Sequence, residues 1–279
     1  MNSGPDPSAS PSDGAHPKDD AASDSGETPL DRSTADIAIV CAHSGEVRPF
    51  LKRLDRQRKY SERGTTFRGG FLGELLRVAV ITPASGFAAH RLATETLIRE
   101  HRPAWVFSVG FSSGLAEEVR SGDLVVASEI VDTHGNSMPV KCSIPGRKRI
   151  HVGRLLVADS HPLESEAKQA LFREHSALAV DTTSLAVAQI CAETNTRFLC
   201  IRSIVDEVAE SVSPQAATFV FESGSRAAGK TLGAVIQSFS RISELNSWRT
   251  RSANAADHLD RFLTGIVEQL GEKIVERRF

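Results

Sequence analysis

The sequence AVDTTS at residues 179–184, followed by RSIVD at residues 202–206, decides the fold of this chain. Each segment is an apolar run that ends on polar side chains, and residues 185–194 between them are compatible with a helix. Two buried strands joined by a helix would deliver their polar ends to one edge of a sheet, which is where open α/β folds bind ligands. The two segments therefore predict an α/β fold with a ligand site near Asp181 and Asp206.

Other apolar runs continue the same alternation of strands and helices. The pattern predicts strands at residues 36–42, 105–110, 124–127 and 155–158, and a hairpin formed by residues 67–71 and 75–82. It predicts helices at residues 46–54 and 88–101. Strands that alternate with helices are typical of a largely parallel or mixed sheet covered on both faces. The expected fold class is therefore α/β, a three-layer αβα sandwich with a mixed central sheet.

The two ends of the chain differ from the body. Residues 1–34 are rich in Ser, Asp, Gly, Pro and Ala, and seven acidic residues face two basic ones. Such a segment buries too little apolar surface to offset its ordering entropy, so it reads as a disordered acidic tail. Residues 241–279 carry apolar side chains at helical spacing and predict a helical extension that packs on its own body or on a partner subunit. The α/β domain is expected at residues 35–240.

Composition excludes several classes of function. The net charge of −2 favours neither nucleic acid nor an anionic membrane as a partner. No apolar stretch approaches the about 20 residues of a membrane span, and no basic, apolar leader opens the chain, so a cytoplasmic protein is expected. The cysteines lack CxxC spacing, and we expect no metal and no organic cofactor; they are Cys41, Cys142, Cys191 and Cys200.

Further motifs lie between the first strand and residue 126. They are IVCAHSGEV at residues 39–47, SGF at 85–87, and GFSSGL at 110–115 followed by SGDLVV at 121–126. With the Asp181 and Asp206 segments, these motifs resemble the nucleoside phosphorylase/nucleosidase superfamily from about residue 36 to residue 233. The chain looks most similar to methylthioadenosine/S-adenosylhomocysteine nucleosidases and to hopanoid-associated phosphorylase-like proteins.

The resemblance implies a phosphorylase-like fold, a homodimer and a small-molecule nucleoside as ligand. It also implies cleavage of the N-glycosidic bond of an adenine nucleoside, such as methylthioadenosine or S-adenosylhomocysteine. Hydrolysis and phosphorolysis both stay open, although the match of Glu46 to a water-activating glutamate favours hydrolysis; phosphorolysis would add phosphate as a partner.

Two carboxylates match the catalytic positions of the family. A purine leaves readily only when a ring nitrogen is protonated, and Asp206 matches the family's acid. The sugar becomes oxocarbenium-like, and Glu46 fits a carboxylate that orients or deprotonates water on the opposite face. Each has a structural alternative: Asp206 as a helix N-cap, and Glu46 as a first-turn residue favoured by the helix dipole. Arg202 is expected to form an ion pair.

The resemblance also assigns residues that line the nucleoside site. They are Ser85, Gly86, Gly110, Phe111, Ser112, Asp181, Thr182 and Thr183. For Asp181, capping of the following helix is the favoured alternative. Thr182 and Thr183 stand where the family carries a Met and a ribose-binding Glu, and a hydroxyl gives a weaker contact than a carboxylate.

Other residues near the expected site depart from the family as well. Phe111 replaces a small residue and is expected to narrow the site. His161 is expected as an exposed loop histidine, with contact to the base as the alternative. A catalytically inactive relative, acting as a nucleoside-binding or interaction protein, is therefore the alternative function.

Overall fold

The computed structural model describes residues 34–222 and 242–276 of the 279-residue chain. The predicted acidic tail lies outside the described residues except for Thr34. The strands are β1 (Ile37–Cys41), β2 (Asp55–Glu62), β3 (Thr65–Leu72), β4 (Leu76–Thr82), β5 (Trp105–Gly114), β6 (Leu124–Asp132), β7 (Ser137–Pro139), β8 (Ile150–Val157), β9 (Ala179–Asp181) and β10 (Arg197–Asp206). The helices are α1 (Arg48–Leu51), α2 (Phe87–His101), α3 (Ser165–His175), α4 (Ser184–Glu193), α5 (Pro214–Ala217), the π-helix η1 (Thr218–Glu222) and α7 (Ile242–Glu276).

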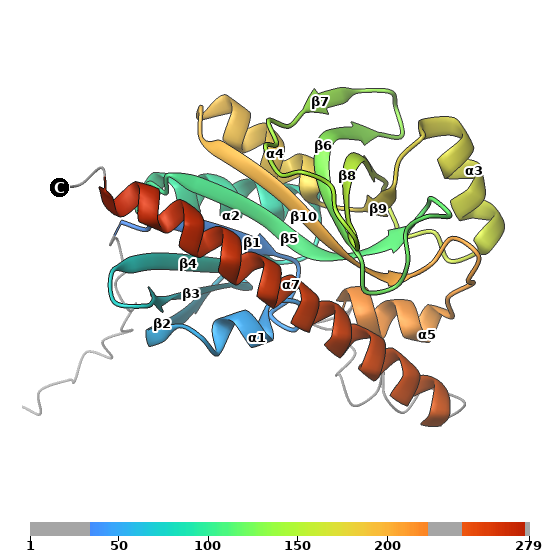
Figure 1. Ribbon diagram of the computed structural model, residues 1–279, viewed down its shortest axis with the longest axis horizontal. Coiled ribbons are helices and arrows are strands. Elements are labelled where there is room, and N and C mark those ends of the chain that lie inside the picture. The colour runs from blue at the N-terminus through green and yellow to red at the C-terminus, as the bar shows by residue number, and fades with distance from the viewer. Residues whose placement is uncertain (1–33, 223–241, 277–279) are drawn as a thin grey trace, which may run out of the picture. The chain divides into compact units, whose positions relative to one another are not determined.

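The ten described strands form one mixed sheet (Figure 1). Strand β1 lies parallel between β4 and β5, and β10 pairs parallel with the other edge of β5. Strand β5 outlasts β1, and its last residues, Ser113 and Gly114, pair with β9. Because β9 connects through β8 and β6 back to β10, these five strands close into a ring. The β1, β5 and β10 carboxyl ends therefore meet at one place.

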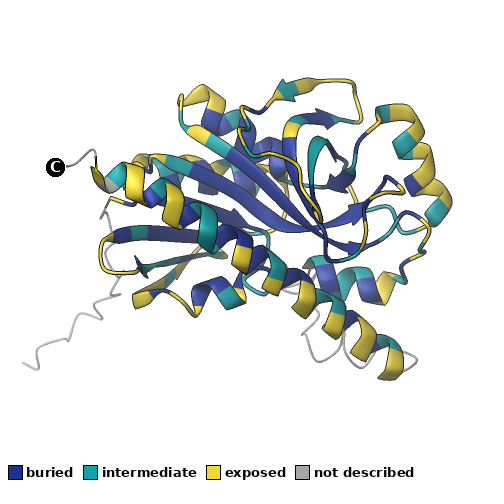
Figure 2. Cartoon of the chain, viewed as in Figure 1, coloured by how far each residue is buried: buried dark blue, intermediate teal, exposed yellow. Residues whose placement is uncertain are grey.

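Helices cover both faces of the sheet because strand residues alternate between them. Ile37, Ile39 and Phe107 face α1 and α7, where they pack with Phe50 and Leu263. On the opposite face, the apolar partners come from α2 and α4, namely Ala93, Leu97, Val187 and Cys191. Figure 1 shows α7 crossing one face with α2 and α4 behind the sheet, and Figure 2 shows the strands between them as buried. The predicted three-layer α/β fold is confirmed.

One strand was missed, and two element predictions need correction. The polar strand β2 was not predicted. It is an edge strand that pairs only with β3, and because its residues are mostly exposed, its sequence shows no pattern of buried apolar side chains. Residues 111–114 form the end of β5 rather than a loop. The helix expected at residues 46–54 is the single turn α1, so Glu46 lies in the preceding turn. Among the described residues, no helix has the length and apolar character needed to cross a membrane.

Candidate active site

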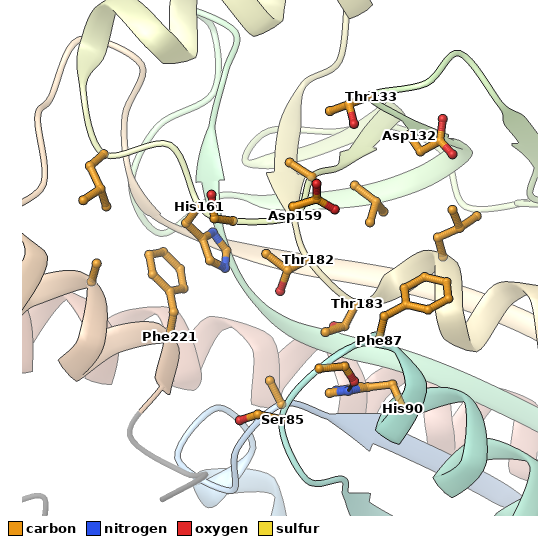
Figure 3. Close-up of a pocket in the computed structure, with 18 of the residues that line it drawn as sticks. Ser85, Phe87, His90, Asp132, Thr133, Asp159, His161, Thr182, Thr183 and Phe221 are labelled. Atoms are coloured by element: carbon orange, nitrogen blue, oxygen red, sulfur yellow. Dashed lines mark hydrogen bonds between the residues drawn. The ribbon is translucent and has the colours of Figure 1, made fainter. Parts of the chain in front are cut away.

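A cavity of about 960 Å³, here called the main cavity, opens where the parallel strands end. Its walls come from the segments that follow β1, β4, β6, β8 and β9, together with α5 and η1. Figure 3 shows His161 and Phe221 on one side of the cavity and Phe87 and His90 on the other. This is the edge at which open α/β sheets bind ligands, as the sequence indicated.

A smaller cavity of about 30 Å³, the inner pocket, adjoins the main cavity beneath it. The two share five lining residues, which are Ala42, His161, Thr182, Thr183 and Phe221. Glu46, Asp181 and Arg202 line only the inner pocket. Asp132 and Asp159 line only the main cavity, so each of the two cavities carries charged side chains.

Glu46 is a buried carboxylate held by the backbone. Its Oε2 accepts the N–H of His43 at 3.1 Å, and its Oε1 accepts the N–H of Phe111 at 2.9 Å. Gly110 makes this placement possible, because a Cβ there would lie 2.7 Å from Glu46 Oε1. The first turn of α1 holds no acidic residue, so the helix-dipole alternative for Glu46 is wrong. The two amide donors fix the direction of the carboxylate.

Asp181 and Arg202 form a buried ion pair at the inner pocket. Arg202 Nε donates to Asp181 Oδ2 at 2.6 Å, and a second guanidinium nitrogen contacts the same oxygen. Burial opposes the charged form of Arg202, but Asp181 outweighs this and raises the pKa of the guanidinium above its ordinary value. Asp181 also accepts the Ser184 hydroxyl at 2.9 Å and the Ser184 N–H at the start of α4, although the N-cap residue of this helix is Thr183.

Asp206 ends β10, but its carboxylate lines neither cavity. Its Oδ1 accepts the Ser113 hydroxyl at 2.9 Å, and its Oδ2 accepts the ammonium of Lys168 on α3. Both side chains of this ion pair are fully buried. No helix begins at Asp206, because α5 starts at Pro214 with Ser213 as its N-cap, so the N-cap alternative for Asp206 is wrong.

Of the remaining predicted site residues, all except Ser112 line one or both cavities. Ser85, Gly86, Thr182 and Thr183 line the main cavity, and Gly110 and Phe111 line the inner pocket with the two threonines. Ser112 lines neither cavity; its hydroxyl donates to the Val180 carbonyl at 2.5 Å and joins β5 to β9.

Phe111 closes one side of the inner pocket. Its ring lies 5.7 Å from that of His43, edge to face, and it also lines a separate cavity of about 420 Å³ next to α7. The ring therefore borders both the inner pocket and that cavity, and the narrowing of the site by Phe111 stays a prediction.

The expectation of an exposed His161 is wrong. Its ring stacks on Phe221 with centroids 3.7 Å apart and lines both cavities. Its Nδ1 is buried and has no hydrogen-bond partner among the described residues. Burial lowers the pKa of His161 to about 4, so the ring is neutral at pH 7. Phe221 lies in η1, far along the chain, and no local sequence signal indicates this contact.

The buried His90 of α2 also lines the main cavity and was likewise missed by the sequence patterns. Its Nδ1 lies 3.0 Å from the Gly86 carbonyl, so this nitrogen carries the proton, and Nε2 is left as an unpartnered acceptor. Burial lowers the pKa of His90 as well. The main cavity is thus bordered by two neutral imidazoles.

His161 should make the folded protein less stable in acid. Its folded pKa of about 4 lies below the unfolded value of 6.5, so its contribution is fully present above pH 6.5 and is lost as the pH falls towards 4. Between pH 7 and pH 5, the wild type should lose about 2 kcal/mol more unfolding free energy than His161→Phe, which keeps the stack but cannot be protonated. Urea denaturation at both pH values measures this difference, and equal losses in the two proteins would contradict it.

Comparison with known proteins identifies the class to which this fold and site belong. The family model for the phosphorylase superfamily matches residues 36–145 and 140–241. The chain belongs to this superfamily.

Individual relatives are nucleosidases by name. The 5'-methylthioadenosine/S-adenosylhomocysteine nucleosidase of Pseudoalteromonas translucida is 24% identical over 238 residues, which cover 74% of this chain and 99% of the relative. The enzyme of the same name from Thermotoga maritima is 26% identical over 184 residues, which cover 61% of this chain and 84% of the relative. A solved nucleosidase structure from Neisseria meningitidis, in complex with methylthio-immucillin-A, has a TM-score of 0.62 at 17% identity and covers 84% of this chain and 99% of its own. The structural likeness confirms the fold.

Proposed function

We propose that this protein cleaves the N-glycosidic bond of an adenine nucleoside such as methylthioadenosine or S-adenosylhomocysteine. The observation that carries the proposal is the placement of Glu46, a buried carboxylate that is oriented by two backbone amides and lines the inner pocket next to the main cavity. Membership of the phosphorylase superfamily and the nucleosidase names of the relatives support the same reaction.

In the proposed reaction, Glu46 orients a water molecule and accepts its proton as the water attacks the sugar. The glycosidic bond breaks with its electrons moving to the base, so positive charge develops on the sugar. A buried carboxylate near that charge stabilises it more than an exposed one would. Thr182 and Thr183 border both cavities and offer hydroxyl groups to the ribose.

The leaving base needs a proton and a surface on which to lie. The paired rings of His161 and Phe221 form an aromatic wall suited to a purine. We propose Asp206 as the acid, as the family resemblance implies. A general acid must lie within hydrogen-bond reach of the atom that it protonates. Since Asp206 is bonded to Ser113 and Lys168 and lines neither cavity, it must exchange one of these contacts to reach the base.

Water fits the site better than phosphate as the acceptor of the sugar. A phosphate dianion is normally held by arginine, lysine or clustered amides. No lysine or arginine of the described ranges lines the main cavity, and Arg202 in the inner pocket is paired with Asp181. These observations favour hydrolysis over phosphorolysis.

A nucleoside-binding protein without cleavage activity is the second candidate function. It is favoured by Thr183, which stands in place of the ribose-binding carboxylate. It is also favoured by Asp206, because both carboxylate oxygens already accept hydrogen bonds from Ser113 and Lys168. In this case the nucleoside would bind in the main cavity, and its base would stay attached to the sugar.

Chromatographic detection of free adenine separates the two functions. Methylthioadenosine, S-adenosylhomocysteine and adenosine are each incubated with wild type and Asp206→Asn, with and without phosphate. Adenine release without phosphate, reduced by about 10²–10⁴-fold in Asp206→Asn, is the expected result for a hydrolase that uses this acid. Absence of release from all three nucleosides by the folded wild type, with binding retained, would establish the second candidate.

We also propose that the protein is a cytoplasmic homodimer, with residues 1–34 as a tail, 35–240 as the catalytic domain and 241–279 as a helical extension. The family resemblance supports the dimer, and the contrast in composition supports the division. Light scattering coupled to size-exclusion chromatography tests the dimer directly.

A further inference from the structure

Lys168 is a fully buried lysine whose ammonium contacts the carboxylate of Asp206. It lies on α3, and its ammonium donates to Asp206 Oδ2, to the Glu207 carbonyl at 3.1 Å and to the Glu210 carbonyl at 2.7 Å. An ammonium has three donors, and here each donor has an acceptor. This arrangement holds the ammonium group in place and leaves it no free hydrogen for other partners.

The surrounding backbone holds the lysine and its acceptors together. The Ser165 hydroxyl donates to the Val208 carbonyl at 2.9 Å, and the Val212 N–H donates to the Leu163 carbonyl at 2.8 Å. The start of α3 is therefore fixed to the segment that follows β10. Lys168 cannot leave Asp206 by a simple rotation into solvent, since its side chain is enclosed.

Few other charges act on Asp206. Burial is the largest influence and leaves the pKa of the Asp206 carboxyl above its ordinary value; Lys168 is the strongest influence that lowers this pKa, the Ser113 hydroxyl lowers it as well, and Glu210 raises it. The Glu210 carboxylate is itself paired with Arg251 of α7 at 2.8 Å, and the Glu207 carboxylate with Arg120 at 2.8 Å. From β5, the facing group is the uncharged hydroxyl of Ser113. Lys168 is therefore the cation that decides whether Asp206 holds a proton.

We propose that Lys168 is a positioning residue that keeps Asp206 ionised at neutral pH, so that Asp206 becomes an acid for the leaving base only when the pH falls. The inference rests on the proposed function for its catalytic consequence, but the charge state of Asp206 stands apart from it. Cleavage by the wild type is then fastest on the acidic side of neutrality. Removing the ammonium leaves a buried carboxyl with no cation, which takes up a proton at neutral pH.

Infrared difference spectroscopy tests the charge state without any need for catalysis. The carboxylic acid C=O band of Asp206 is obtained by subtracting Asp206→Asn from wild type, and Lys168→Met/Asp206→Asn from Lys168→Met, at pH 7. We expect no such band in the wild type and a clear band in Lys168→Met. A band in the wild type, or its absence from folded Lys168→Met, would overturn the proposal. If Lys168→Met does not fold, the wild-type spectrum alone decides.

The pH profile of adenine release tests the catalytic consequence. In Lys168→Met, the fall in the rate of adenine release on the alkaline side of the profile should occur at a pH higher by at least about one unit. On that side of the profile, this shift is about a tenfold gain in the protonated fraction of Asp206. Arg154→Met is the matched control, because it removes a cation that pairs with Glu129 on β6 and does not act on Asp206; its profile should match the wild type. An unmoved limb in Lys168→Met, with no infrared band, overturns the role of Lys168 while cleavage itself stands. Absence of cleavage in every variant, with the expected bands, refutes the proposed reaction and supports the role of Lys168 in setting the charge of Asp206.

Discussion

Replacing Glu46 with Gln is expected to lower the rate of adenine release by about 10²–10⁴-fold. The amide cannot accept a proton from water, and its NH₂ group would face one of the two N–H donors, from His43 or Phe111, that now bind the carboxylate. Nucleoside binding should persist, because the walls of the main cavity are unchanged. Steady-state kinetics with methylthioadenosine separates the two effects, with the loss in kcat rather than in KM.

Glu129→Gln is the matched control for this change. Glu129 lies on β6, pairs with Arg154 at 2.8 Å and lines neither cavity of the site. Its replacement should leave the rate of release at the wild-type value. A folded Glu46→Gln protein with an unchanged kcat would exclude Glu46 from the reaction.

Replacing Arg202 with Met is expected to lower the free energy of unfolding by about 3–5 kcal/mol. Asp181 would remain buried with its charge opposed only by Ser184, since the guanidinium contacts to Asp181 and to the Ser108 hydroxyl are lost together. The loss is large because a buried carboxylate without a cation keeps its desolvation cost. Urea denaturation monitored by circular dichroism measures it.

Arg120→Met provides the comparison for an exposed ion pair. Arg120 is 64% exposed and pairs with Glu207 at 2.8 Å, so its removal should cost less than about 1 kcal/mol. The double variant Asp181→Asn/Arg202→Met should recover part of the stability lost in Arg202→Met, because it removes the unpaired charge as well. Equal destabilisation by Arg202→Met and Arg120→Met would contradict a special role for burial.

The sequence predicts most of the sheet because its buried strands are short apolar runs bounded by turns. It misses the polar edge strand β2, whose residues are mostly exposed and carry no burial pattern. It also misses the ring of five strands, because the pairing of β9 with the end of β5 depends on contacts between distant segments. Ser112 and Ser113 resemble a loop in sequence, but they are buried strand residues that bond to Val180 and Asp206.

The site is predictable only where a motif or a strand end marks it. Glu46 and Thr183 follow strands, and the structure brings both to the inner pocket. Lys168 is hidden from pattern analysis, since a lysine on a polar helix normally faces solvent. His161 is hidden for a related reason, because its burial depends on stacking with Phe221 from another part of the chain.

Three carboxylates are buried at this edge of the sheet, but the described lysines and arginines form ion pairs with only two of them. Asp181 pairs with Arg202 and Asp206 pairs with Lys168, while Glu46 is held by backbone amides. Glu46 is therefore the buried carboxylate of the inner pocket that has no lysine or arginine partner among the described residues, and His43 Nε2 lies 3.8 Å from its Oε1. Mobile ions screen buried charges much less than exposed ones. The attraction of Glu46 for a positively charged nucleoside analogue should consequently change little between low and high ionic strength, whereas that of the exposed Asp159 at the main cavity should weaken as salt is added.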